Sequence, residues 1–402
     1  MPPRRRRAEQ GSRRRWRAVL LFVVGAMAGV ALWAYSPDLP PELLIARYSN
    51  AHSTFLDVGG TRAHVRDEGK PDGQPLLMIH GSLGSLQAWE GWVKELGDRY
   101  RLISVDLPGH GLTGPWPRGE YTIEAYCDFI EVLADTLKLD RFAIAGNSMG
   151  GAVAWSFAAT RPDRVTALIL VDSSGFPRGG TPPLSIRLAR LPVIGDIGIH
   201  FKPDLLVRRS LLEVYADPAM VTPQRVKRFS ELQRFPGNRA ATLARARTQE
   251  PLDPSVLRHL SLPTLIIWGA KDRWTPVADA FRFQSEIKGA KLAIFEKLGH
   301  WPMEEDPQAT AAAVAAFLPT EPPAAPAAAP APAALGDLPG DQQMRDQPSP
   351  DQLAPGQENP DQPIPPAPPP RAAVEQARPE ATAPPDQPSA EPDKADTKPK
   401  EN

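Results

Sequence analysis

Short apolar runs alternate with helical segments along most of this chain, and that alternation restricts the possible folds more than any other feature. Residues 123–137 place their apolar side chains on one helical face, and residues 152–160 are also helical in character. Buried strands that alternate with helices predict an α/β fold, a parallel sheet with helices on both faces. The expected strands are residues 76–80, 101–106, 141–145, 167–172, 264–268 and 291–295.

Two further segments frame this alternation. Residues 53–58 and 61–67 are extended runs around Gly59-Gly60, which predicts a β-hairpin. Residues 176–258 break the alternation with helical pieces separated by prolines, and they carry 14 basic and 7 acidic side chains. We expect this segment to be an insertion that lies over the sheet.

The N-terminus has the pattern of a membrane anchor. Residues 1–17 form a basic arm with eight arginines and one glutamate, and residues 18–35 contain no charge. Eighteen helical residues span roughly 27 Å, which is enough to cross the hydrocarbon core of a bilayer. Trp16, Trp33 and Tyr35 bracket the run, as aromatic residues do at membrane interfaces. The positive-inside rule then places residues 1–17 in the cytoplasm and the body on the other side, joined by a linker of residues 36–49.

A cleaved signal peptide is the main alternative for this segment. Gly29 and Ala31 form a possible cleavage site, and residues 12–16 faintly resemble a twin-arginine export signal. A buried core helix is disfavoured by the eight neighbouring arginines. The anchor and the signal both place the body outside the cytoplasm, held at a single-pass anchor in the first case and secreted in the second.

The C-terminal residues 319–402 differ in composition from the rest. They contain 23 of the 48 prolines, 14 acidic and 6 basic side chains, and no Phe, Trp or Tyr. Such a segment cannot bury enough apolar surface to offset the entropy of the chain, so it predicts a disordered acidic tail. The tail could reach an unknown partner or act as a spacer.

Gly146-Asn147-Ser148-Met149-Gly150-Gly151 directly follows one predicted strand and opens a helix. A G-x-S-x-G sequence in that context predicts a nucleophile elbow, which exposes the serine hydroxyl at the top of the sheet. The N-terminus of the helix favours developing negative charge. Ser148 is therefore the candidate nucleophile.

A serine needs a base and an acid that orients the base. His300 follows the strand 291–295 and Asp272 follows the strand 264–268, so both lie at the carboxyl edge with Ser148. Asp172 also ends a strand and is the rival acid. Asp272 is favoured, because the order Ser148, Asp272, His300 is the one expected for a nucleophile elbow of this kind.

An oxyanion requires two backbone N–H donors. Met149, which follows the nucleophile, and Ser82, in the loop after residues 76–80, are the candidates. His80 and His110 are each expected to be structural. Cys127 lies in a helix-like stretch, where we expect a core or surface position and no nucleophilic role.

These motifs together resemble the α/β-hydrolase fold family. The resemblance rests on an HG-x oxyanion loop, a DLPGHG turn, a G-x-S-M-G-G elbow, a WGAKD acid loop and a GHWP histidine loop, in that order. It implies a hydrolase domain over about residues 50–318, with an eight-stranded, mostly parallel sheet. It also implies a helical cap after the sixth strand, where residues 176–258 lie.

The nucleophile narrows the chemistry that the resemblance implies. Haloalkane dehalogenases and epoxide hydrolases of this family use Asp at the elbow, whereas this chain has Ser148. Carboxylic-ester hydrolysis, as in esterases and lipases, is favoured. The alternative is carbon–carbon bond hydrolysis, because GNSMGG and the Trp301 after His300 are similar to hydrolases of ring-cleavage products, whose oxyanion loop is usually richer in Gly and Pro.

Leu83 in the oxyanion loop and Trp301 are the candidate substrate contacts. The cap has an apolar series that suits an acyl chain or the core of the cap itself: Phe176, Leu184, Ile186, Leu188, Leu191, Ile194 and Phe201. Its surplus of arginines predicts either contact with anionic lipid headgroups or a solvated face.

A non-catalytic, membrane-tethered binding protein is the alternative from another class. Such proteins usually lose a member of the triad, and here all three residues are in place. No cluster of metal ligands or cofactor motif is found in the sequence, and the triad needs neither; no nucleic-acid partner is expected.

Overall fold

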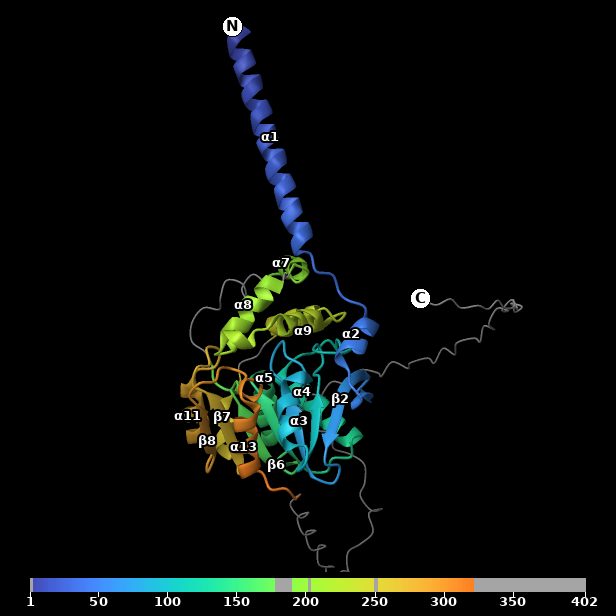
Figure 1. The fold of residues 1–402 in the computed structure, drawn as a ribbon, viewed down its shortest axis with the longest axis vertical. Coiled ribbons are helices and arrows are strands. Elements are labelled where there is room, and N and C mark those ends of the chain that lie inside the picture. The colour runs from blue at the N-terminus through green and yellow to red at the C-terminus, as the bar shows by residue number, and fades with distance from the viewer. Residues whose placement is uncertain (1–2, 178–189, 202–203, 249–251, 322–402) are drawn as a thin grey trace, which may run out of the picture. The chain divides into compact units, whose positions relative to one another are not determined.

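An eight-stranded sheet forms the centre of the computed structural model (Figure 1). Its strand order is β1-β2-β4-β3-β5-β6-β7-β8, and β2 runs in the direction opposite to that of the other seven strands. The prediction of a mostly parallel, eight-stranded α/β-hydrolase sheet is therefore confirmed. The strands are β1 Ser53–Val58, β2 Thr61–Gly69, β3 Gln74–Ile79, β4 Tyr100–Val105, β5 Phe142–Asn147, β6 Val165–Val171, β7 Thr264–Gly269 and β8 Lys291–Phe295.

The structure describes residues 3–177, 190–201, 204–248 and 252–321, with only the backbone for residues 3–15 and for Leu206. The helices before the cap are α1 Pro3–Ala34, α2 Pro41–Tyr48, η1 Leu86–Trp89, α3 Glu90–Leu96, α4 Ile123–Thr136 and α5 Met149–Thr160. Those of the cap region and beyond are α7 Ile194–Gly198, α8 Asp204–Val214, η2 Pro218–Met220, α9 Pro223–Gln233, α10 Asn238–Thr248, η3 Pro254–His259, α11 Val277–Glu286, α12 Pro302–Glu305 and α13 Pro307–Phe317. The predicted tail lies outside the described residues from residue 322 onward.

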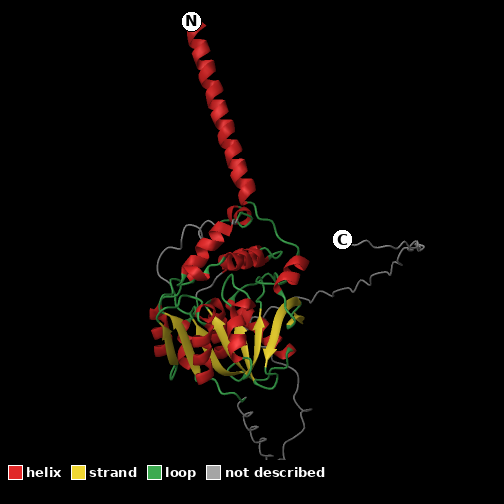
Figure 2. Cartoon of the chain, in the orientation of Figure 1, coloured by secondary structure: helices red, strands yellow, loops and turns green. Residues whose placement is uncertain are grey.

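Helices cover both faces of the sheet (Figure 2). On one face α4, α5 and α11 pack against alternate strand residues such as Leu77 and Ile144. On the other face α3 and α13 pack against the intervening residues, such as Met78 and Ala145. Because both faces are buried, the central strands are apolar throughout and do not alternate with polar residues.

The described helices of residues 190–248 lie over the carboxyl ends of the strands, between β6 and β7 in the sequence (Figure 1). This matches the expected position of the cap. Trp301 joins the cap to the body, since its ring stacks on Phe229 at 4.8 Å and meets Tyr215 edge-on at 5.4 Å. In the cap series, Leu184, Ile186 and Leu188 lie outside the described residues.

Two members of that series do not line a pocket or a core. Leu191 and Ile194 are exposed, so for them the expected acyl-chain pocket or cap core is wrong. The prolines and glycines around α7 keep this helix short, and it presents its apolar side chains outward. Phe176, in contrast, is buried against Phe283.

One helix of the described residues is long and apolar enough to cross a membrane. Its candidate span is Trp16–Ala34, with a mean hydropathy of 2.0 and no residue of that window buried. A signal sequence near the N-terminus meets the same criteria, so the choice between anchor and signal stays a prediction. The helix ends at Ala34, and residues 36–48 then fold back onto the body through α2.

Cys127 is buried in α4, so of the two positions that we expected, core or surface, it occupies the core. Its thiol lies 3.6 Å from the carbonyl oxygen of Val153, and burial raises its pKa to about 12. A thiol that stays protonated at neutral pH is a weak nucleophile. Cys127 therefore has a packing role.

Asp106, at the end of β4, organises the loop below the site. Its fully buried carboxylate accepts hydrogen bonds from His64 at 2.7 Å and from the backbone amides of Leu86 and Leu112. Burial alone would raise the pKa of Asp106, but the hydrogen bond and charge of His64 outweigh it and lower the pKa to about 2. The carboxylate thus stabilises the fold at all pH values above its unfolded pKa, and this contribution is lost as the pH falls toward 2.

We expect Asp106→Asn to destabilise the detergent-solubilised full chain by about 3 kcal/mol at neutral pH, because it replaces a fully buried carboxylate that accepts hydrogen bonds from His64 and from two backbone amides. Guanidinium denaturation followed by tryptophan fluorescence measures the loss. The difference from the wild type should shrink as the pH falls below about 4, where the wild-type contribution is itself lost. The exposed Asp98→Asn is the control and should change stability by less than about 0.5 kcal/mol; an equal loss in both variants would contradict the assignment.

Candidate active site

Ser148 lies in a sharp turn between β5 and α5. Its backbone has φ 53° and ψ −117°, a conformation that L-residues adopt only under constraint. A Cβ on Gly146 would lie 2.1 Å from the carbonyl oxygen of Gly150, and a Cβ on Gly150 would lie 2.3 Å from that of Ile79. Only glycine permits these close approaches, so the elbow geometry predicted from the motif is present.

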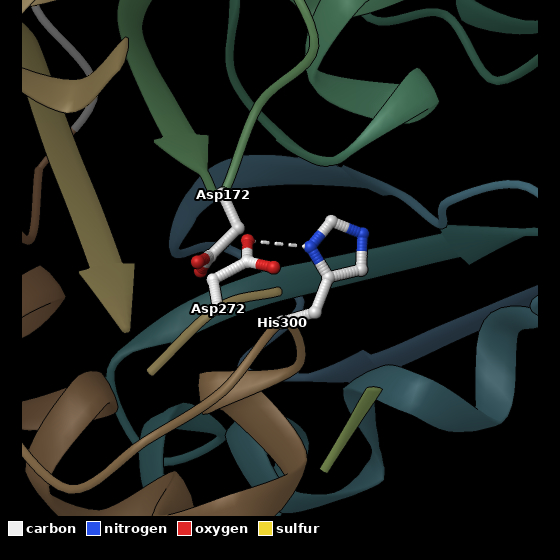
Figure 3. A group of neighbouring side chains, drawn as sticks. All are labelled: Asp172, Asp272 and His300. Carbon is white, nitrogen blue, oxygen red and sulfur yellow. Dashed lines mark hydrogen bonds and ion pairs between the residues drawn. The ribbon is translucent and has the colours of Figure 1, made fainter. Parts of the chain in front are cut away.

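Asp272 and His300 form a hydrogen-bonded pair at the same edge of the sheet. Nδ1 of His300 lies 2.7 Å from Oδ2 of Asp272, as Figure 3 shows, and the imidazole is buried. The Asp272 carboxylate also accepts hydrogen bonds from the backbone amides of Trp274 and Thr275 and from the Thr275 hydroxyl. Burial alone would raise the pKa of Asp272, but His300 and these donors lower it below its ordinary value. Asp272 is thus an ionised acceptor that orients the imidazole.

The elbow and the histidine loop are joined by the side chain before the serine. Nδ2 of Asn147 donates to the carbonyl oxygens of His300 at 3.1 Å and of Val171 at 3.0 Å. Among the described residues, no hydrogen bond links the Ser148 hydroxyl to the His300 imidazole. Catalytic hydrogen bonds are often long without substrate and tighten only in the complex. The structure therefore places Ser148 and the Asp272–His300 pair at the same carboxyl edge of the sheet, without a hydrogen bond between the serine hydroxyl and the imidazole.

The predicted oxyanion loop lies against the elbow. The Ser82 hydroxyl donates to Sδ of Met149 at 3.4 Å, and a Cβ on Gly81 would lie 3.0 Å from Cβ of Ser148. Met149 is the first residue of α5, where backbone amides have no intrahelical acceptor. Ser82 and Met149 are thus adjacent, and their roles as oxyanion donors stay predictions.

His80 and His110 have the structural surroundings that we expected. His80 uses both ring nitrogens, one with the carbonyl oxygen of Gly81 at 2.8 Å and one as acceptor from the amide of Leu107 at 3.0 Å. Burial lowers the pKa of both imidazoles, that of His110 well below its ordinary value. Both residues brace the loops beneath the site as neutral side chains.

Asp172, the rival acid, lies beside Asp272 without reaching the imidazole. One ligand atom each of Asp172, Asp272 and His300 lie within 4.8 Å of one another (Figure 3). Oδ1 of Asp172 accepts from the amide of Gly269 at 3.1 Å, while its buried Oδ2 has no partner among the described residues. Burial, and then the negative charge of Asp272, raise the pKa of Asp172 well above its ordinary value. Asp172 is therefore a neutral carboxylic acid next to an ionised one.

These three side chains are also the group among the described residues that could hold a metal ion. Hydrogen bonds already occupy the Asp272 carboxylate and Nδ1 of His300, so a metal would have to displace them. As it stands, the hydrogen-bonded pair can hold or move a proton at Nε2 of His300 without any rearrangement.

Two residues of the site were not identified from the sequence. The Trp274 ring stacks on His300 at a centroid distance of 6.0 Å and is 37% exposed, so it forms an accessible aromatic surface beside the imidazole. The Thr275 hydroxyl lies 3.2 Å from Nδ1 of His300 and donates to Asp272. Their signal was their position directly after the acid, in the sequence Asp272-Arg273-Trp274-Thr275.

The predicted substrate contacts differ in accessibility. Leu83 is half-buried in the oxyanion loop, with a positive φ of 60°. Trp301 is buried, and its ring is occupied by Phe229 and Tyr215 of the cap. Leu83 therefore offers the larger accessible surface, and both roles stay predictions.

Comparison with protein families agrees with this geometry. The family model described as alpha/beta hydrolase fold matches residues 74–307, more than half of the chain. The chain belongs to the α/β-hydrolase fold family. This confirms the resemblance inferred from the motifs and accounts for the elbow, the sheet and the cap as parts of one hydrolase architecture.

The relatives of this hydrolase include one named for an activity and one without an assigned activity. An uncharacterized protein of Mycobacterium tuberculosis is 30% identical over 281 residues, which cover 66% of this chain and 81% of the relative. The 2-hydroxymuconate semialdehyde hydrolase of a Pseudomonas species is 28% identical, with 70% of this chain and 95% of the relative covered. The crystal structure of a bacterial membrane phospholipase A has a TM-score of 0.57 and 24% identity, covers 76% of this chain and 97% of its own, and shows the shared fold.

We expect Asp172→Asn to remove a pH-dependent loss of stability. A buried acid whose folded pKa is raised stabilises the fold fully below its unfolded pKa, and this contribution is lost as the pH rises through the folded pKa. The amide cannot ionise, so the stability of the variant relative to the wild type should increase from pH 5 to pH 9. Denaturation midpoints at four pH values measure this trend, and a constant difference would contradict a neutral Asp172.

Proposed function

We propose that this hydrolase is a membrane-anchored serine hydrolase that cleaves carboxylic esters through an acyl-enzyme. The observation that carries the proposal is the Asp272–His300 hydrogen bond of 2.7 Å at the edge where the strained elbow presents Ser148. An oriented imidazole next to an elbow serine is the arrangement that activates a hydroxyl as nucleophile.

The proposed reaction has two halves. Ser148 Oγ attacks the acyl carbon while Nε2 of His300 takes its proton, since Nδ1 is bonded to Asp272. The resulting imidazolium is stabilised by the Asp272 carboxylate, and the oxyanion accepts hydrogen bonds from the amides of Ser82 and Met149. His300 then protonates the leaving alcohol. In the second half water, deprotonated by His300, releases the acid and restores Ser148.

Membrane anchoring is the second element of the proposal. It is supported by the unburied apolar span Trp16–Ala34 and by the basic arm before it. We place residues 1–17 in the cytoplasm and the hydrolase domain outside it, with signal cleavage and secretion as the alternative. The membrane phospholipase with the same fold is consistent with a lipid-derived ester as substrate.

Carbon–carbon bond hydrolysis is the second candidate function. It is favoured by the relationship to the 2-hydroxymuconate semialdehyde hydrolase, whose similarity extends over 294 residues. The same serine and the same proton shuttle would serve that reaction. An ester series and a ring-cleavage product, assayed side by side, separate the two.

We expect Ser148→Ala to abolish turnover of p-nitrophenyl esters from acetate to palmitate by the full chain in detergent. Loss of the nucleophile typically lowers kcat by about 10⁴-fold or more. Ser156→Ala, a half-buried serine further along α5, is the matched control and should keep wild-type rates. A folded wild type that hydrolyses no ester would overturn the esterase proposal and direct the test to carbon–carbon substrates.

The two neighbouring carboxyl groups can be separated by the same isosteric change. We expect Asp272→Asn to lower kcat by about 10⁴-fold, because the amide cannot stabilise the imidazolium. Asp172→Asn should change kcat by less than about tenfold, since Asp172 is already neutral and does not contact His300. Equal losses in the two variants would show that Asp272 has been assigned the wrong role.

A further inference from the structure

The segment that follows the apolar span is fixed to the cap. The amide of Ser36 donates to the carbonyl oxygen of His200 at 2.8 Å, and the Tyr35 ring lies 5.8 Å from that of Phe201. The buried guanidinium of Arg239, in α10, donates to the carbonyl oxygens of Ser36 and Ile199 and pairs with Asp38 at 2.5 Å. These contacts join the end of α1 to two parts of the cap.

Residues further along the segment repeat this attachment. Arg234, which follows α9, accepts from the amide of Leu39 at 2.8 Å and donates from Nε to the carbonyl oxygen of Pro37 at 2.7 Å. Glu231 of α9 accepts from the Tyr48 hydroxyl at 2.7 Å, and Leu44 of α2 is fully buried. Residues 35–48 are therefore a packed strap on the cap, which fixes the side of the domain from which α1 leaves.

Large apolar side chains are exposed on that same side. Their side chains are between 46% and 66% exposed. They belong to α7, to its flanks and to the start of α8: Leu191, Val193, Ile194, Ile197 and Leu205. We call this set the α7 face. It adjoins Phe201 and so lies next to Tyr35, where the apolar span ends (Figure 1). Several large apolar side chains exposed in neighbouring elements are uncommon on a soluble domain, and such a cluster marks an interaction site.

Cationic side chains border the α7 face. Arg190 directly precedes Leu191, and Arg208 and Arg209 lie on α8 three and four residues after Leu205, which places them on the same side of that helix. All three are exposed, and none forms an ion pair among the described residues. The nearby acid Asp196 is paired with Arg247, and Asp204 accepts from Ser230. An apolar strip with a cationic border complements the acyl boundary and the anionic headgroups of a bilayer.

We propose that the α7 face docks into the headgroup–acyl boundary of the bilayer that α1 crosses. The inference rests on the proposed membrane anchoring, and it follows from three observations: the strap fixes the exit of α1 at the cap, the α7 face adjoins that exit, and its border is cationic. Docking turns the cap toward the lipid. The ester substrate of the proposed reaction would then be a lipid that reaches the strand ends from the bilayer.

A fluorescent probe tests whether the α7 face enters the bilayer. The chain has one cysteine, the buried Cys127, so Cys127→Ala gives a background free of thiols. Ile197→Cys, at a position 57% exposed, is labelled with an NBD fluorophore, and Phe281→Cys on α11, at a position 53% exposed, is the matched control. Full-length proteins are placed in vesicles of three parts phosphatidylcholine to one part phosphatidylglycerol, with or without a doxyl-labelled lipid.

We expect the probe at position 197 to shift to the blue relative to detergent and to be quenched about twofold or more by the doxyl lipid. The probe at position 281 should show neither change. A probe at 197 that stays water-exposed overturns the docking. A blue shift without lipid quenching also overturns it, because the face is then covered by protein.

A soluble short-chain ester, assayed in the same vesicles, separates this inference from the proposed function. If the probe shows docking but no ester is hydrolysed, the proposed ester hydrolysis is contradicted and the docking of the α7 face is supported. If the ester is hydrolysed but the doxyl lipid does not quench the probe, the ester hydrolysis is supported and the docking is contradicted. If the protein does not float with the vesicles, both the membrane anchoring and the docking are contradicted.

A separate variant tests whether docking of the α7 face helps a lipid substrate to reach the site. The triple substitution Val193→Ser, Ile194→Ser and Ile197→Ser should lower the turnover of an ester embedded in vesicles by about fivefold or more, because the apolar surface that docks is lost. Turnover of the soluble ester should be unchanged. Val132→Ser, an exposed apolar residue of α4, is the control; equal loss on both substrates in the triple variant would contradict a docking role.

Discussion

The first turn of α5 contacts the carboxyl ends of β3 and β5 at distances that only glycine allows, and the candidate site depends on this contact. Gly146 and Gly150 leave no room for a Cβ against backbone carbonyl groups. A second glycine pair does the same for the other half of the site, since a Cβ on Gly269 would lie 2.1 Å from the carbonyl oxygen of Gly299. Backbone packing at two glycine contacts thus brings the elbow, the acid loop and the histidine loop to one edge, before any catalytic side chain interacts.

The cap and the histidine loop form one structural unit. The amide of His300 donates to the carbonyl oxygen of Val214 in α8, and the amide of Ala216 donates to the Glu305 carboxylate. Trp301 extends this contact through its ring stacking with Phe229. Because His300 itself and the adjacent Trp301 make contacts with the cap, a displacement of the cap would also displace the His300 imidazole. The strap of residues 35–48 is attached to the same cap, so packed contacts connect it through the cap to the histidine loop.

The sequence was sufficient for the parts of the structure that local patterns control. Apolar runs buried on both faces predict the central strands, and the motif order predicts the elbow and the Asp272–His300 loops, because each depends on neighbouring residues. Trp274 and Asp172 could not be assigned in the same way, since their surroundings come from loops far apart in the chain. The predictions for Leu191 and Ile194 were wrong for a related reason. An apolar spacing shows that a helix has an apolar face but does not show whether that face turns inward or toward a membrane.

The two acids that the sequence left as rivals are distinguished by their donors. Two carboxyl groups this close cannot both be ionised in a buried site without a large cost, so the pair holds one proton. Asp272 receives hydrogen bonds from His300, from the Thr275 hydroxyl and from two backbone amides. Asp172 receives one from the amide of Gly269, and its other oxygen has no partner in the described part of the chain. The donors favour negative charge on Asp272, and the proton therefore resides on Asp172. A neutral Asp172 keeps the charge of the pair next to the imidazole, where a developing imidazolium would be stabilised.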